Sequence, residues 1–137
     1  MPPSTHVYGI DTSVFVRLLT GHPEEDFQKT ASALEKLHKE VPSTELVVSN
    51  QVIGEAYITL QFHYSIAKED ARGAILELFK TGSVSPLKGQ TVLNILEARG
   101  GAGLLDRLIV EDYQNQGVNG LTNDKRISRL PGIKLLG

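Results

Sequence analysis

Short apolar runs alternate with longer amphipathic stretches along the whole chain, and no other feature constrains the fold as strongly. The short runs predict β-strands at residues 7–10, 46–48, around 84, 118–121 and 133–136. The longer stretches predict helices at residues 12–19, 24–39, 50–64, 67–80, 91–98 and 104–116, and a helical turn at 125–129. Strands that alternate with helices form parallel sheets that are covered on both faces. The pattern therefore predicts an α/β fold, with five strands in a mostly parallel sheet and helices on both faces.

Length and composition predict a single domain spanning residues 1–137. The chain is 40% hydrophobic and 22% charged, which is enough apolar sequence to bury a core and is unlike a disordered protein. The formal net charge of −2 gives no overall attraction for nucleic acid, so a polyanion would need a local basic patch. The best candidate is the group formed by Lys125, Arg126, Arg129 and Lys134, which an ordinary solvated surface explains equally well.

The chain contains no cysteine, which excludes disulfides and cysteine-ligated zinc and fits a reducing compartment. Residues 1–7 are largely polar and show no basic segment followed by an apolar run. No stretch is long enough and apolar enough to span a bilayer. We therefore expect a cytoplasmic protein without a secretory signal or a membrane span.

Four of the 16 acidic residues stand at positions that solvation alone does not explain. Asp11 and Asp124 follow predicted strands, where each has the alternative role of capping a helix or turn. Glu55 interrupts an apolar helix face, where a carboxylate is costly unless it is paired, metal-bound or in reach of water at a groove edge. Asp106 lies on another apolar face, near a helix N-terminus that favours negative charge. Each position thus has an ordinary structural explanation when it is taken alone.

Taken together, the four carboxylates predict an acidic crevice that binds a metal ion. Ligand sites in such sheets gather at the carboxyl ends of the strands, and a doubly wound sheet can bring all four acids there. Two carboxylates about 5 Å apart repel by roughly 3 kcal/mol at an effective dielectric near 20. Several such pairs would require raised pKa values or a neutralising divalent cation. Ligands that are all oxygen favour Mg²⁺ or Mn²⁺, which are common in phosphodiester hydrolysis.

Four segments, in this order, resemble the motifs of PIN-domain nucleases. They are GIDTSVFVRLL around Asp11, NQVIGEAYITL around Glu55, LLDRLIVEDYQNQGVNGLTND from Leu104 to Asp124, and ISRLPGIKLL near the end. Together they cover nearly the whole chain. In length and arrangement the chain is most similar to the small stand-alone PIN proteins, of which VapC-type toxins are the largest group.

The resemblance implies a five-stranded parallel sheet and cleavage of RNA that depends on Mg²⁺ or Mn²⁺. It carries the catalytic and metal-binding acids onto Asp11, Glu55, Asp106 and Asp124, with Thr12, Ser13 and Thr122 as supporting polar groups. It also implies a homodimer and a partner antitoxin protein. Lys125, Arg126 and Arg129 are adjacent to the last acid in sequence and are candidates for contacting the RNA backbone.

The sequence departs from the family pattern beside two of these acids. Arg107 follows Asp106 where a small residue is commoner, and no aromatic residue follows Asp124 closely. These departures bear on the choice of substrate more than on metal binding. The RNA that would be cleaved is not indicated by the sequence.

Other functions fit the sequence less well. A PIN-fold binding module with little or no catalysis is the main alternative, although all four acidic positions are filled. A phospho-receiver domain would need an acceptor Asp after the central strand, where Pro86 and Leu87 stand instead, and a haloacid-type phosphatase would need Asp-x-Asp after the first strand. His6, His22, His38 and His63 show no metal-ligand spacing, so we interpret them as surface or structural residues. Tyr57, Phe62 and Tyr64 are interpreted as core residues, with a groove for a partner helix as the alternative.

Overall fold

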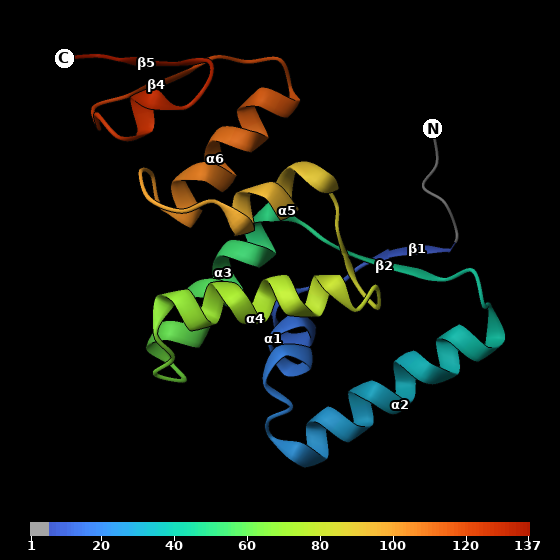
Figure 1. The fold of residues 1–137 in the computed structure, drawn as a ribbon. Coiled ribbons are helices and arrows are strands. Elements are labelled where there is room, and N and C mark those ends of the chain that lie inside the picture. Colours follow the sequence, from blue (N-terminus) through green and yellow to red (C-terminus); the bar gives the residue numbers. More distant parts are fainter. Residues whose placement is uncertain (1–5) are drawn as a thin grey trace.

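The computed structural model describes residues 6–137 and has a parallel three-stranded sheet on one side of the molecule (Figure 1). Its strands are β1 (Val7–Gly9), β2 (Glu45–Val48) and β3 (Ser85–Pro86), in the order β1-β2-β3. Tyr8 is in register with Leu46, and Val47 with Ser85. The predicted first two strands are therefore confirmed, and the third begins one residue after Val84. The predicted absence of a secretory signal falls mainly on residues 1–5, outside the described residues.

A second parallel sheet pairs β4 (Gly120–Thr122) with β5 (Ile133–Leu135), and it is separate from the first. In Figure 1 it lies beyond α6 (Leu104–Asn115), at the opposite side of the molecule from β1 and β2. The α/β class and the parallel pairing are confirmed, but the prediction of five strands in one sheet is wrong. All three residues of β1 are exposed and Leu121 of β4 is 67% exposed, so these short strands bury little apolar surface that would hold them together.

The helices lie where the sequence predicts them, with ends that differ by one or two residues. Besides α6 they are α1 (Thr12–Thr20), α2 (Glu24–Glu40), α3 (Asn50–Phe62), α4 (Lys68–Lys80) and α5 (Gln90–Glu97), and a 3-10 helix spans Ile127–Arg129. Local signals account for their ends. Gly21, with a φ of 64°, ends α1 and donates its backbone N–H to the Arg17 carbonyl over 2.8 Å. The Ser49 hydroxyl accepts the Val52 N–H at the start of α3.

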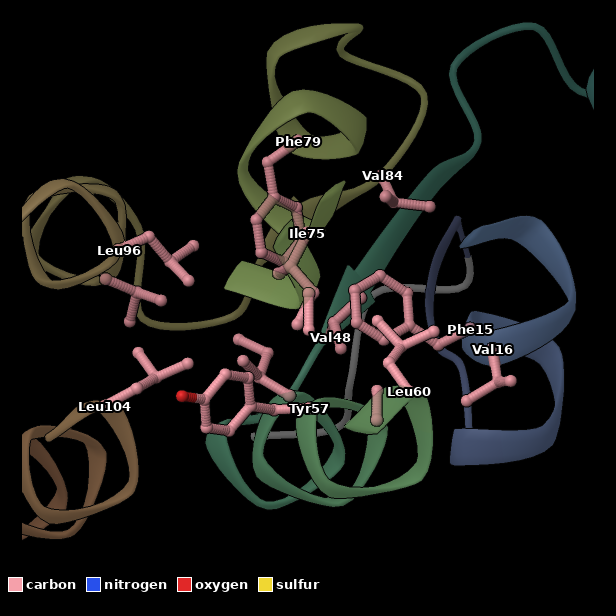
Figure 2. Close-up of a cluster of buried hydrophobic side chains, with 14 of the residues drawn as sticks. Phe15, Val16, Val48, Tyr57, Leu60, Ile75, Phe79, Val84, Leu96 and Leu104 are labelled. Atoms are coloured by element: carbon pink, nitrogen blue, oxygen red, sulfur yellow. The ribbon is translucent and has the colours of Figure 1, made fainter. Parts of the chain in front are cut away.

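The core lies between the three-stranded sheet and the helices that pack around α3 (Figure 2). Figure 2 shows Phe15 of α1, Val48 of β2 and Phe79 of α4 converging on it, together with Leu60 of α3 and Leu104 of α6. The rings of Phe15 and Phe79 stack with centroids 5.6 Å apart. This cluster fixes where the two ends of α3 lie, and therefore where the candidate site residues on α3 are held.

Close packing of α3 against α6 depends on a glycine. A Cβ at Gly54 would lie 3.1 Å from the Cδ2 atom of Leu105, tighter than most van der Waals contacts. Gly54 therefore lets the two helices approach closely.

Candidate active site

Asp11 stands between β1 and α1 and caps the helix. Its Oδ1 accepts the Ser13 hydroxyl at 2.7 Å and the Val14 N–H at 3.1 Å. These hydrogen bonds, the one from Ser13 above all, stabilise the charged form and hold the pKa of Asp11 below its usual value, against a smaller opposing effect of burial. The capping explanation is therefore right. The side chain is nevertheless exposed, which leaves this carboxylate accessible from solvent.

Glu55, in the middle of α3, lies beside the start of α1. The Thr12 hydroxyl donates to its Oε1 over 3.1 Å, which links two segments that are 43 residues apart in sequence. Glu55 is exposed at the edge of a groove of about 340 Å³ between α3 and α6, so the alternative in which it reaches water there is right. The helix face that it shares with Ile58 and Phe62 is also open to solvent, with exposures of 42% and 80%.

Asp106 lies in the first turn of α6, where the helix dipole favours its charge. It is half-buried and lines a small cavity of about 110 Å³, together with Thr122 of β4 and Ile127 of the 3-10 helix. No described residue forms a hydrogen bond or ion pair with its carboxylate. Asp106 is therefore grouped with the C-terminal sheet and not with α1.

Asp124 follows β4 and organises the turn after it. Its Oδ1 accepts the backbone N–H of Arg126 at 2.7 Å, and the Thr122 hydroxyl accepts the backbone N–H of Asp124 at 3.0 Å. The Arg126 guanidinium lies 3.9 Å from the same Oδ1. The turn-capping explanation is right here too, and Thr122 supports the loop that holds Asp124. Lys125, Arg126 and Arg129 are all exposed around this turn.

By the contacts they make, the four acids fall into two groups. Asp11 and Glu55 lie beside α1, whereas Asp106 and Asp124 lie near the C-terminal sheet. Over residues 6–137, no group of three or more His, Cys, Asp or Glu side chains is arranged to hold a metal ion. Because each group is open to water, water can solvate its ionised carboxylates in this arrangement.

A buried polar contact between α3 and α6 was not foreseen from the sequence. Asn50 is 4% exposed, and its Nδ2 donates to the Glu111 Oε1 at 2.9 Å and the Asp112 Oδ1 at 2.8 Å. Their helical spacing from Asp106 predicts that Glu111 and Asp112 are both solvated. Asp112 is exposed, but Glu111 is only 8% exposed, so the prediction is wrong for Glu111. The sequence contains part of this signal, because Ser49 and Asn50 are both of a residue type that caps helices. Only Ser49 is used as the cap.

The aromatic residues near the end of α3 divide between core and surface. Tyr57 is 9% exposed and belongs to the core, as predicted. Phe62 is 80% exposed, so the prediction that it packs in the core is wrong. Tyr64 is half-buried and lies beside His63 and His22. His22, His63 and Tyr64 line a cavity together with Thr12, and the sequence showed no sign of this cavity.

Fold and site together define an α/β protein with parallel strands and acidic residues that follow strands or line helix faces. A protein-family model for the PIN domain matches residues 8–133. The chain therefore belongs to the PIN domain family, which is generally a nuclease fold. No curated protein matches the chain significantly. Of the described residues, none belongs to a helix long and apolar enough to cross a membrane.

Proposed function

We propose that this protein is a divalent-metal-dependent endoribonuclease that hydrolyses RNA phosphodiester bonds. Membership of the PIN domain family supports a nuclease. The observation that carries the proposal is the Thr12–Glu55 hydrogen bond, which brings the first two acidic motifs together in space. Two accessible carboxylates supported by neighbouring hydroxyls are suited to hold a hard cation or to accept a proton.

Each residue has a proposed role in this site. Asp11, Glu55, Asp106 and Asp124 are the candidate catalytic and metal-binding acids. Ser13 holds the Asp11 carboxylate, Thr12 holds Glu55, and Thr122 supports the backbone at Asp124. Lys125, Arg126 and Arg129 would contact RNA phosphates, because they are exposed next to Asp124.

The metal part of the proposal goes beyond the present arrangement of the acids. Bound Mg²⁺ or Mn²⁺ supplies Lewis-acid activation of water and of phosphate oxygens. The described residues do not form a group of three or more acids that fits such an ion. We therefore assign no catalytic step to a metal.

The first experiment is cleavage of total RNA by the purified protein with Mg²⁺, with Mn²⁺ or with excess chelator. Asp11→Asn should lower the cleavage rate by about a hundredfold or more, as loss of an essential acid does. Asp70→Asn is the matched control, because Asp70 is an exposed acid in the first turn of α4, outside the candidate site. Cleavage that persists in chelator, or in the Asp11→Asn protein, would contradict the proposal.

Metal binding is measured separately, by Mn²⁺ titration followed by electron paramagnetic resonance. The proposal predicts that Glu55→Gln and Asp106→Asn both weaken Mn²⁺ binding, although the two residues belong to different groups. A reduction by only one of them would restrict the metal site to that group. Asp70→Asn again serves as the control.

A PIN-fold binding module with little or no catalysis is the second candidate function. It is favoured by the lack of a metal-binding group in the part of the chain that the structure describes. A well-folded protein that binds RNA, binds no Mn²⁺ and cleaves nothing would support it. Strong metal-dependent cleavage would exclude it.

The resemblance of the sequence to VapC-type toxins, in length and arrangement, leads to a proposal about partners. We propose a homodimer and an antitoxin partner, and the exposed apolar residues Ile58, Phe62 and Ile109 give a protein partner a surface to cover. Light scattering of the purified protein tests the dimer. Growth arrest on expression of the wild type, but not of Asp11→Asn, tests the toxin role.

A further inference from the structure

A cavity of about 440 Å³ lies beside the candidate active site, between α1, the segment that follows it and the C-terminal end of α3. Its chemically distinctive lining residues are Arg17, His22, His63 and Tyr64. This volume falls within the range of typical small-ligand pockets, roughly 300–1,000 Å³. The cavity is therefore large enough to receive one nucleotide.

The cavity shares a wall with the candidate acids. Thr12 and Ser13 line it, and the same two hydroxyls donate to Glu55 and Asp11. The two carboxylates do not line the cavity themselves, so a group bound there would be separated from each of them by one hydroxyl. The groove between α3 and α6, in contrast, has Glu55 in its own lining.

One side of the cavity is aromatic. The Tyr64 ring meets the His63 ring edge-to-face with centroids 4.9 Å apart, and it meets the His22 ring in the same manner at 6.2 Å. Neither imidazole, nor the Tyr64 hydroxyl, forms a hydrogen bond within residues 6–137. Unstacked RNA bases are bound by such rings, through stacking and through hydrogen bonds to base edges.

The positive charge in the cavity comes from Arg17. Its guanidinium makes a single ion pair of 3.7 Å with Asp26, and the two side chains are 33% and 47% exposed. A guanidinium has five N–H donors, so most of them are available to a phosphate. Aromatic rings can bind a base, and a guanidinium with unused N–H donors can bind its phosphate. This cavity has both.

We propose that this cavity binds one nucleotide of the RNA substrate, directly beside the phosphodiester bond to be cleaved. The base packs against Tyr64 and His63, and the phosphate contacts Arg17. The inference rests on the proposed nuclease function for its biological meaning. The ligand is a ribonucleotide, and its binding is measurable without cleavage.

The test titrates the full-length protein with adenosine 5′-monophosphate in excess chelator and follows binding by NMR chemical shifts. Adenosine and inorganic phosphate are the parallel probes. We expect the nucleotide to bind more tightly than either probe and to shift signals of residues 12–22 and 59–64. Each variant is first checked by thermal unfolding.

His63→Ala should weaken nucleotide binding roughly fivefold or more, as loss of a base-stacking ring does. Tyr64→Leu, which keeps apolar bulk where Tyr64 packs against the core, should do the same. Arg17→Gln should abolish the preference for the nucleotide over adenosine. Phe62→Ala is the matched control, because Phe62 is an exposed ring at the end of α3, next to His63 in sequence, and does not line the cavity.

No nucleotide binding, or an equal loss with Phe62→Ala, would overturn the inference. Because the probe has no phosphodiester bond and no metal is present, the result does not depend on nuclease activity. Binding that needs His63 and Tyr64 would support the cavity even if the protein cleaves no RNA. Cleavage of RNA combined with no binding in the cavity would uphold the proposed function and reject the inference.

Discussion

At the scale of single residues, two of the candidate acids cap a helix or a turn and are still accessible to solvent. Asp11 caps α1 and Asp124 caps the turn after β4, yet Asp11 is exposed and Asp124 is only half-buried. A cap fixes the direction of one carboxylate oxygen and leaves the other toward solvent. The capping and catalytic explanations therefore do not exclude each other at these positions.

Substitutions at Asp11 separate the two roles. Asp11→Ala should lower the free energy of unfolding by about 1 kcal/mol, because Ala cannot accept the Val14 N–H. Asp11→Asn should have almost no effect on stability, since Asn caps helices about as well as Asp. Chemical denaturation of both variants measures the difference. Equal destabilisation by the two substitutions would mean that the charge, and not the cap, stabilises α1.

Asp11 also predicts a small dependence of stability on pH. The folded protein holds its pKa below the ordinary value for an aspartate, so its ionised form stabilises the fold at neutral pH. This contribution is lost as the pH falls through the lowered folded pKa. The side chain is exposed, so solvent screening keeps the effect modest. In thermal unfolding, the wild type should lose stability relative to Asp11→Asn as the pH falls through the lowered pKa of Asp11, and a difference that stays constant with pH would contradict this.

At the scale of elements, α3 contributes residues to the core, to the candidate active site and to the proposed nucleotide cavity. One face carries the buried Ile53, Ala56 and Leu60, and another carries the exposed Glu55. Its N-terminal turn meets α6 through Asn50, and its C-terminal end lines the proposed nucleotide cavity. Small shifts of α3 would therefore move the acidic pair and the cavity together.

The contact between α4 and the end of α5 should contribute measurably to stability. Arg72 is 7% exposed, and its guanidinium donates to the Leu96 and Ile95 carbonyls, each over 2.9 Å. Burial lowers the pKa of Arg72, and the nearby Glu69 carboxylate partly offsets this. Arg72→Met should cost about 1–3 kcal/mol, because it leaves both carbonyls without these partners.

Arg99→Met is the matched control for this prediction. Arg99 donates to Glu69 over 2.9 Å, but its side chain is 72% exposed, and such surface pairs contribute less than about 1 kcal/mol. Urea unfolding compares the two variants directly. Equal losses would show that the buried hydrogen bonds of Arg72 add nothing beyond a surface ion pair.

At the scale of the whole molecule, the two sheets are unequal in stability. The β4–β5 pair is a two-stranded sheet with exposed residues on both strands, whereas β2 is paired on both sides and contributes Leu46 and Val48 to the core. Isolated two-stranded sheets are marginally stable. The C-terminal sheet is therefore the region expected to open first.

Native-state hydrogen exchange tests this expectation. Amides of β4 and β5 should exchange at least about tenfold faster than those of β2, which is a matched parallel strand. Added Mn²⁺ should slow exchange around Thr122 and Asp124 if these residues take part in metal binding. Equal protection of both sheets in the absence of metal would contradict the expected difference in stability.

The sequence predicted the local structure well because its signals are local. Caps, glycine helix ends and apolar periodicity act over a few residues, so the helices were located to within one or two residues. The signal for β3 was weaker, because a strand of two residues, Ser85 and Pro86, shows almost no periodicity. Phe62 and Glu111 were misassigned because burial depends on which element packs over a residue, and a single helix pattern does not contain that information.

The sequence by itself determined the α/β class, the parallel direction of the strands, the family motifs and the identity of the candidate acids. Tertiary structure alone decided how the strands divide into two sheets, that Thr12 beside Asp11 meets Glu55, and that Asp106 lines a cavity with Thr122 of β4. It also decided that Arg17, His63 and Tyr64 surround one cavity. The physical reason is range, because propensity and capping act between neighbours, whereas a site depends on the packing of helices that are distant in sequence.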